Sequence, residues 1–234
     1  MTMFSTARHG AKGWYNRSHA RLIVPAGAAA VAAVALVAYL LWPTWDTVGP
    51  TGPERLPVSI GGTLFNVPTT AIRVKIQRHS GAQERIDLSF AFPSLDPLPA
   101  SKRVSADAVE DAMPAIDRIF LSIAAHHDTL APDVRVRTIY PRYLQQESTP
   151  GQDGLAMRAF RDGTPYGGED LFYANSPSLN ARCSRDAETP GMCLSEQRIN
   201  GADLTFRFPR SWLSRWRDVA NAMDLLAVQL HGPG

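Results

Sequence analysis

The pattern of hydrophobic and polar residues divides the chain into one long apolar segment and a strand-rich remainder. No charged residue occurs from Leu22 to Trp45. As a helix, residues 22–42 would extend over about 31 Å, which matches the hydrocarbon thickness of a bilayer. Tyr39, Trp42 and Trp45 gather at the far end of the segment, where an interfacial aromatic belt would lie. The sequence therefore predicts a transmembrane helix over residues 22–42.

The charged residues around this segment predict the orientation of the helix across the membrane. Four basic residues precede it, and Arg55 alone follows within about 20 residues. The positive-inside rule then makes residues 1–21 a cytoplasmic tail in the inner membrane and places the rest in the periplasm of a Gram-negative cell. A cleaved signal peptide is the alternative, because Ala33-Val34-Ala35 resembles a cleavage site. Cutting there would leave an exposed apolar tail over residues 36–42, which favours an uncleaved anchor.

Residues 43–55 are rich in proline and glycine and predict a stem, followed by one extracytoplasmic domain over residues 56–234. At the start of this domain, Gly61-Gly62 suits a two-residue primed turn, which needs positive φ at both positions. That turn would place Val58 opposite Phe65 and bury one face of a hairpin over residues 56–67.

Alternation of apolar and polar residues predicts further strands. Residues 72–77 and 85–92 alternate cleanly and predict an antiparallel pair with one solvated face. Additional strands are expected at residues 118–125, 134–140, 155–161, 170–174 and 202–208.

The apolar period becomes helical between Trp212 and Leu230, which predicts an amphipathic C-terminal helix packed on one face of the sheet. An amphipathic helix lying on the membrane is the alternative, but its polar face would be richer in lysine and arginine. The expected fold class is α+β, with a single transmembrane helix followed by a mostly antiparallel sheet and this helix.

Charge excludes one class of partner. Four of the 24 basic residues and none of the 22 acidic ones precede residue 22, so the remainder has 20 basic against 22 acidic side chains. A nucleic-acid binder needs a basic face to displace counterions from phosphates. We therefore expect no nucleic-acid partner. Alanine pairs such as Ala28 and Ala32 have the spacing that allows close helix approach, so a homodimer through the anchor stays open.

The two cysteines, Cys183 and Cys193, flank a segment that contains Pro190 and Gly191. In an oxidising compartment this spacing predicts a disulfide bond. It lacks the C-x-x-C spacing of a redox or zinc pair.

Two polar clusters are candidates for chemistry. His126, His127 and Asp128 could bind a metal or share acid–base work, but adjacent strand residues point to opposite faces. Glu169 and Asp170, with nearby arginines at positions 158 and 161, could form a second site beside the loop 162–168. For each cluster the alternative is a solvated strand end or a hairpin with surface ion pairs. The chain has none of the common nucleophile-elbow, phosphate-loop, dinucleotide or zinc-protease motifs.

These observations favour a membrane-anchored, non-enzymatic module that binds a protein partner in the envelope and needs no cofactor. A toxin-immunity protein is one specific version. The alternative is a membrane-tethered hydrolase or metal-dependent enzyme that uses His126 or His127 with Asp128.

Overall fold

The computed structural model describes residues 31–34, 36–37, 54–99, 116–187 and 189–231. The chain divides into two units, Met1–Trp45 and Asp46–Gly234. Within the described part of the chain, no helix is long and apolar enough to cross a membrane. The predicted tail 1–21 lies outside the described residues. So do most of the predicted span 22–42 and most of the stem 43–55.

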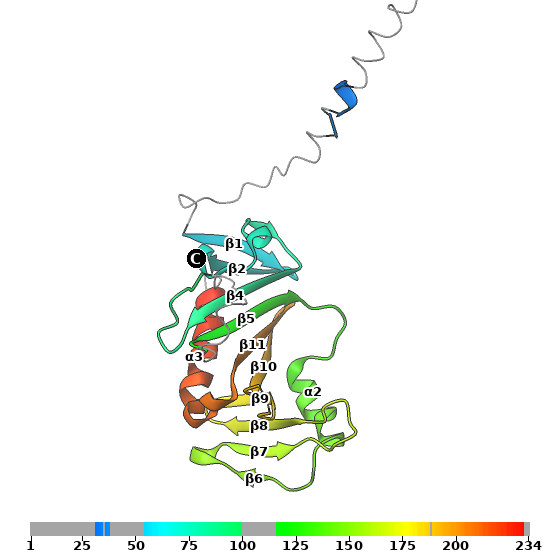
Figure 1. Ribbon diagram of the computed structural model, residues 1–234, viewed down its shortest axis with the longest axis vertical. Helices are drawn as coiled ribbons and strands as arrows, with labels where there is room; N and C mark the ends of the chain where they lie inside the picture. The colour runs from blue at the N-terminus through cyan, green and yellow to red at the C-terminus, as the bar shows by residue number, and fades with distance from the viewer. Residues whose placement is uncertain (1–30, 35, 38–53, 100–115, 188, 232–234) are drawn as a thin grey trace, which may run out of the picture. The chain divides into compact units, whose positions relative to one another are not determined.

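The second unit is built on an eight-stranded antiparallel sheet with the order β4-β5-β11-β10-β9-β8-β7-β6 (Figure 1). The strands are β4 (Arg85–Ala91), β5 (Arg118–Ala125), β6 (Thr149–Pro150), β7 (Ala156–Ala159), β8 (Glu169–Asn175), β9 (Ser178–Ser184), β10 (Met192–Ile199) and β11 (Ala202–Pro209). The predicted α+β class with a mostly antiparallel sheet is confirmed. Strands β6, β9 and β10 of this sheet are additional to the predicted ones.

A smaller sheet is formed by β1 (Arg55–Ile60), β2 (Thr63–Pro68) and β3 (Gly81–Ala82). β1 and β2 form the predicted hairpin, with Val58 opposite Phe65. Gly61 and Gly62 both have positive φ, as a primed turn requires. The five apolar side chains on the inner face of the hairpin are buried: Leu56, Val58, Ile60, Phe65 and Val67.

Two hairpin turns meet backbone to backbone beside this small sheet. A β-carbon on Gly61 would lie 1.9 Å from the carbonyl oxygen of Gly201, and one on Gly201 would lie 1.9 Å from that of Gly61. The N–H of Gly201 also donates to Oγ1 of Thr63 at 3.1 Å. The contact leaves no room for a side chain on either glycine, so the two sheets join through paired glycines.

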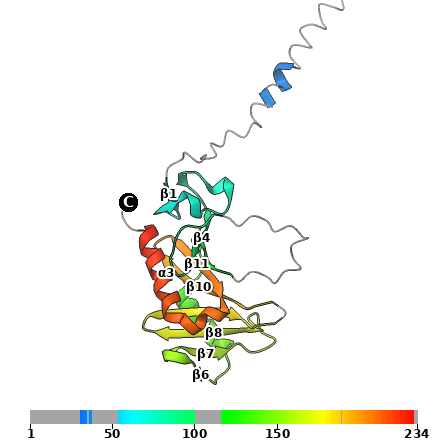
Figure 2. The same cartoon turned by 60° about the vertical axis from the view of Figure 1, so that its left-hand side comes forward.

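The predicted C-terminal helix is present as α3 (Trp216–His231), preceded by the 3-10 turn η6 (Arg210–Arg215). The inner face of α3 belongs to the main core together with residues of β1, β2, β4, β5 and β11. Its buried residues are Trp216, Val219, Ala220, Ala222, Met223, Leu226, Ala227 and Leu230. Packing of this helix into the core is therefore confirmed. Figure 2 shows α3 alongside β11 and β10.

Two predicted strands are wrong. Residues 72–77 contain one β-bridge, at Ile72, and then the 3-10 turn η2 (Lys75–Gln77), which leaves Ile76 exposed. The side-chain amide of Gln77 holds this turn to β4, because its nitrogen donates to Asp87 at 3.2 Å and its oxygen accepts the Asp87 N–H at 2.9 Å. Residues 134–140 fall in helix α2 (Pro132–Thr138) and the start of η4 (Tyr140–Arg142). Two further 3-10 turns are η1 (Thr69–Ala71) and η5 (Gln152–Gly154).

Helix α2 and turn η4 cover a second, smaller core. Tyr140, Leu144, Phe160 and Leu171 are its buried members, and the rings of Tyr140 and Phe160 meet edge to face at 5.5 Å. Helix α3 packs in the main core, whereas helix α2 packs against this second core. Figure 1 shows why two clusters arise: β10 and β11 run across the direction of β9 to β6, so the sheet turns a corner between β10 and β9.

Candidate functional site

The histidine candidates do not converge on one site. Nε2 of His126 lies 3.2 Å from a guanidinium nitrogen of Arg198, whereas Nε2 of His127 lies 3.1 Å from the carboxylate of Glu84, where both side chains are highly exposed. Asp128 is exposed and has positive φ. Among the described residues, no group of three His, Cys, Asp or Glu side chains is placed to hold a metal ion. The first cluster therefore forms two separate surface contacts.

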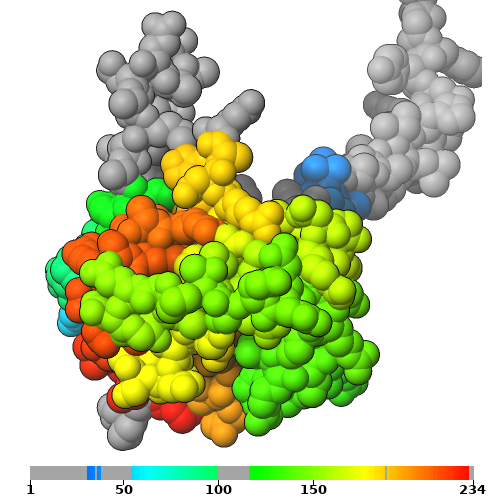
Figure 3. Space-filling model, turned by 90° about the horizontal axis from the view of Figure 1, so that it is seen from below, coloured from blue at the N-terminus to red at the C-terminus, as the bar shows by residue number. Residues whose placement is uncertain are grey.

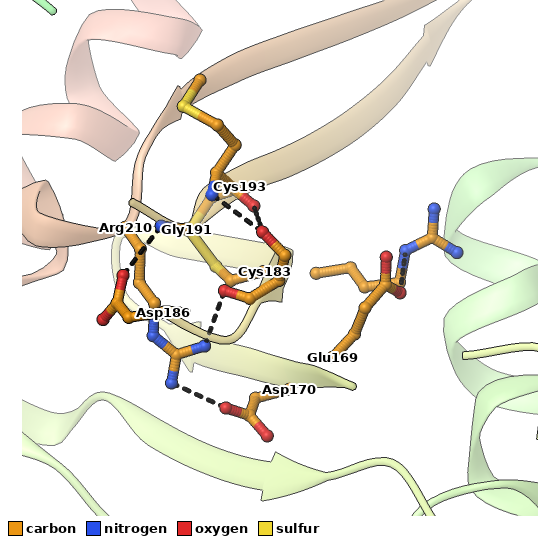
Figure 4. Close-up of a disulfide and its surroundings, with 10 residues drawn as sticks. Glu169, Asp170, Cys183, Asp186, Gly191, Cys193 and Arg210 are labelled. Carbon is orange, nitrogen blue, oxygen red and sulfur yellow. Dashed lines mark hydrogen bonds and ion pairs between the residues drawn. A yellow bond between two sulfur atoms is a disulfide. The ribbon is translucent and has the colours of Figure 1, made fainter. Parts of the chain in front are cut away.

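Glu169 and Asp170 point to opposite faces of β8, as neighbours on a strand must. Glu169 pairs with Arg182 at 3.0 Å, and the guanidinium of Arg182 lies 5.0 Å from the ring of Tyr166. Asp170 is buried and faces the disulfide side of the sheet (Figure 4). The two carboxylates serve different ion pairs, so the structure does not bring them together.

Asp170 is the centre of a buried ion-pair network. Its carboxylate accepts from Nε of Arg185 at 3.0 Å and from Arg210 at 2.6 Å. Arg210 also donates to the carbonyl of Ser184 at 3.1 Å, and the pKa of Arg185 is raised, chiefly by its hydrogen bond to Asp170. Buried charges need such partners to offset their lost hydration. The network therefore ties β8, the end of β9 and the turn after β11 together.

Arg158 and Arg161, the arginines expected beside Glu169 and Asp170, have other partners. Arg158 donates to the carbonyl of Gln145 and Arg161 to that of Arg142, so the two guanidinium groups hold the end of η4 and the chain segment that follows it. The loop 162–168 turns inward at Tyr166, whose ring lies 5.2 Å from that of Tyr140. The second cluster thus supports the fold.

The predicted disulfide between Cys183 and Cys193 is present and buried (Figure 4). It joins β9 and β10 at the corner of the sheet, where the ladder is short. In the described part of the chain their backbone ladder contains three residue pairs: Cys183 with Cys193, Arg182 with Leu194, and Ala181 with Ser195. The hydroxyl of Ser184 adds hydrogen bonds to the backbone of Met192. Beyond them, residues 178–180 pair with β8 alone and residues 196–199 with β11 alone. We call this divergence the seam opening.

Two hollows lie at the seam opening. One, on the α2 side, has a volume of about 20 Å³, room for about one water, and is lined in part by Leu194 and Arg182. The other, on the α3 side, has a volume of about 130 Å³ and is named here the α3-side cavity. Its lining residues are Ser178, Asn180, Ser195, Glu196, Gln197, Phe206, Met223 and Asp224. Figure 3 shows the face hollowed between the yellow β8–β9 hairpin and the green segment with α2, with orange atoms of β10 between them.

The polar side chains that line the α3-side cavity differ in whether they have an ion pair or a hydrogen bond within the described part of the chain. Glu196 pairs with Arg135 at 3.1 Å. The amide nitrogen of Gln197 is buried and has no hydrogen-bond partner among the described residues. Asp224 has no ion pair or hydrogen bond within the described part of the chain, and burial raises the pKa of its carboxyl. The cavity therefore presents hydrogen-bonding capacity that the chain itself does not use.

Sequence reasoning missed this cavity, because its residues come from β9, β10, β11 and α3. Asp224 fits the polar positions of a helical pattern, and Ser195 and Gln197 lie in a strand that was not predicted. The one available signal was the cysteine pair, which fixes where β9 and β10 meet but not where they diverge.

No protein-family model matches the chain, and no characterised protein matches its sequence. Among solved structures it is similar to an immunity protein of the Stenotrophomonas maltophilia type IV secretion system, with a TM-score of 0.51 and 14% identity over 76% of this chain and 94% of that one. It is also matched to the iron-regulated outer membrane lipoprotein of Neisseria meningitidis, with a TM-score of 0.37 and 11% identity over 72% of this chain and 92% of that one. The first likeness shows a shared fold, and the second is too low to carry an argument.

Proposed function

We propose that this chain is an immunity-type protein: a non-enzymatic, single-pass inner-membrane protein whose domain, residues 56–234, binds and caps a toxic partner protein in the periplasm. The observation that carries the proposal is the fold shared with a secretion-system immunity protein over 94% of that protein's length. The predicted anchor over residues 22–42 supplies the location, since four basic residues precede it and a disulfide-bonded domain follows.

The placement of the polar candidates supports binding rather than catalysis. Asp170 and Glu169 are engaged with arginines, and His126 and His127 contact different partners. A catalytic group must come within hydrogen-bond reach of the atoms that react, together with its helpers. In the described part of the chain these candidates do not share a cleft in which that arrangement could form.

The architecture also suits a capping role. A sheet fixed by a buried disulfide and by a buried network around Asp170 presents a surface that loses little freedom on binding. Attachment to the membrane raises the concentration of the domain where an incoming toxin would arrive. Both features improve protection without new contacts.

Affinity purification of the full chain at native expression, after crosslinking and detergent extraction, tests the proposal. We expect one stoichiometric protein partner, encoded beside this gene and toxic when expressed in the periplasm without it. Co-expression of this chain should restore growth, and a variant with a scrambled segment 22–42 should restore less. Recovery of the protein alone would contradict the proposal, as would equal fitness of a deletion strain in competition with its parent.

A further inference from the structure

We propose that the α3-side cavity at the seam opening is a receptor for one basic side chain, a lysine or an arginine, presented by the protein partner. This rests on the proposed function for the source of the side chain, but the chemistry of the cavity stands on its own geometry.

The cavity is lined by oxygen acceptors. The lining includes the carboxylate of Asp224 with hydroxyl and amide side chains, over a floor that includes the apolar Phe206 and Met223, whereas the carboxylate of Glu196 is directed to Arg135 of α2. None of the lining residues that the structure describes is a lysine, arginine or histidine. A guanidinium has five N–H donors and an ammonium three, and neither accepts a hydrogen bond. A lining of this kind therefore complements a basic group.

Asp224 is the carboxylate that such a group would pair with. Glu196 already contacts Arg135, whereas Asp224, an exposed residue with a partly shielded carboxyl, has no ion pair or hydrogen bond among the residues that the structure describes. Partial burial raises the pKa of this carboxyl, and a nearby positive charge would favour its ionised form. The neighbouring amide of Gln197 is also unsatisfied, and its oxygen and nitrogen can exchange places by rotation of the amide. Both groups gain most from a donor that enters the cavity.

Size limits the occupant to a side chain. A cavity of about 150 Å³ in another protein holds one benzene molecule. At about 130 Å³, the α3-side cavity can hold a guanidinium or ammonium head with part of its stem, but not a folded segment of a partner. The binding energy would be concentrated in one anchoring residue, and arginine is enriched among such anchors.

The rim of the cavity indicates what surrounds that residue. Leu225 and Val228 lie one and four positions after Asp224 on α3, and they are 49% and 67% exposed. Val228 is close to Asp224 on the helix surface because the two are four positions apart, and Leu225 is close to Val228 because they are three apart. A basic residue of the partner would therefore be flanked by apolar side chains that cover Leu225 and Val228.

Methyl NMR of the full chain in detergent, with labelled methionine, tests the cavity directly because Met223 lies in its lining. The probes are n-butylguanidinium and n-butylammonium, and the neutral n-butylurea is the matched control. We expect a saturable shift of the Met223 signal with at least one cationic probe, with a dissociation constant in the millimolar range, and none with the urea. The variant Asp224→Asn should weaken binding at least tenfold, while Asp218→Asn, an exposed acid on the same helix, should leave it unchanged.

Three results would contradict the proposed receptor site: no saturable shift of the Met223 signal, an equal shift with n-butylurea, or undiminished binding of the cationic probe by the Asp224→Asn variant. Thermal unfolding of each variant shows whether it is folded, so loss of binding cannot be mistaken for loss of structure. If the cationic probe binds but purification yields no protein partner, the proposed function fails. The ligand of the cavity is then a free small cation and not a side chain of a partner. The two failures are thus distinguishable.

Discussion

Two aspartates near the corner of the sheet, Asp170 and Asp224, have carboxylates with opposite surroundings. Asp170 is buried and accepts from two guanidinium groups, whereas Asp224 is only partly shielded and has no partner in the described part of the chain. The first arrangement stabilises the fold and the second does not. Substitution by asparagine, which keeps the shape and removes the charge, separates the two roles.

Asp170→Asn is expected to destabilise the protein strongly. It leaves the guanidinium groups of Arg185 and Arg210 without their counter-charge, and breaking a buried pair in this way costs about 3–5 kcal/mol. The free energy of unfolding in urea measures the loss. Asp162→Asn is the matched control, because that side chain is 86% exposed and lies 3.5 Å from Arg185; its effect should stay within about 1 kcal/mol. Similar losses in both variants would contradict a central role for Asp170.

Asp224→Asn is expected to stabilise the protein at neutral pH. Burial raises the folded pKa of Asp224, so the folded state keeps a proton that the unfolded chain has released. The fold therefore loses stability as pH rises from about 3.9, the usual aspartate value, through the raised pKa. The variant should lack this loss, and its advantage should disappear below about pH 3.5. Urea unfolding at several pH values measures it, and a variant that is less stable at pH 7 would contradict it.

The pKa of Asp87 is shifted in the opposite direction from that of Asp224. Burial acts to raise its pKa, but hydrogen bonds from Arg85 and Gln77 together with the charge of Arg85 outweigh burial and lower it. This contribution to stability is present above about pH 3.9 and is lost as pH falls through the depressed value. Asp87→Asn should therefore lower stability at neutral pH and reduce the sensitivity of the fold to acid. An unchanged acid-unfolding midpoint would contradict it.

At the scale of elements, alternation predicted the strands whose inner positions are large and apolar. β4 and β5 carry Ile86 and Leu88, and Ile119 and Leu121, on the buried face, and their bounds were predicted within one residue at each end. In β9, buried and partly exposed positions alternate just as regularly. Its buried residues are Leu179, Ala181 and Cys183, and two of these three side chains are small. Small side chains carry too weak a hydrophobic signal to identify a strand.

The two wrong strands failed for different local reasons. Residues 134–140 are rich in β-branched residues, yet Pro132 begins a helix that Asp133 and Arg137 support as an ion pair four residues apart. In residues 72–77 the alternation is real, but Gln77 bonds to Asp87 and turns the chain away from the sheet. A helix start signal outweighed strand propensity in the first segment, and a contact between residues ten positions apart decided the second.

Removal of the disulfide tests how far the short β9–β10 ladder depends on it. In the double variant Cys183→Ala, Cys193→Ala, the loss of the constraint on the unfolded chain is expected to cost about 2–3 kcal/mol. Amide exchange at Ala181 and Ser195 should rise more than exchange in β4 and β5, because the described β9–β10 ladder has only two backbone pairs besides the cysteines. Uniform protection across the sheet would show that the ladder holds without the bond.

At the scale of the whole molecule, the proposed orientation in the membrane rests on the charge around residues 22–42. Alkaline phosphatase folds only in an oxidising compartment, so a fusion after residue 234 should be active if the domain is periplasmic. A variant with Arg8, Lys12, Arg17 and Arg21 changed to glutamine should lose much of this activity, because those residues set the predicted direction. An inactive fusion of the unchanged chain would contradict the proposed topology.

The α3-side cavity is also a feature of the whole molecule, because residues from both halves of the sheet and from α3 line it. The sequence predicted the disulfide and the packing of α3, which are two of its boundaries. It did not predict that β9 and β10 separate after three pairs. That separation depends on the direction in which each half of the sheet runs, and no local pattern encodes it.

The paired glycines at positions 61 and 201 limit how the protein can be tagged. Hairpin tips are ordinarily good sites for inserted epitopes or fluorescent labels. Here both tips are closed, because each backbone occupies the space that a side chain of the other would need. The loop around Gly163, where an added β-carbon meets nothing within 4 Å, is the open alternative, although positive φ there calls for insertion after the glycine rather than its replacement. A reporter placed there should leave the fold intact, whereas the same insertion at either tip should pull the two sheets apart.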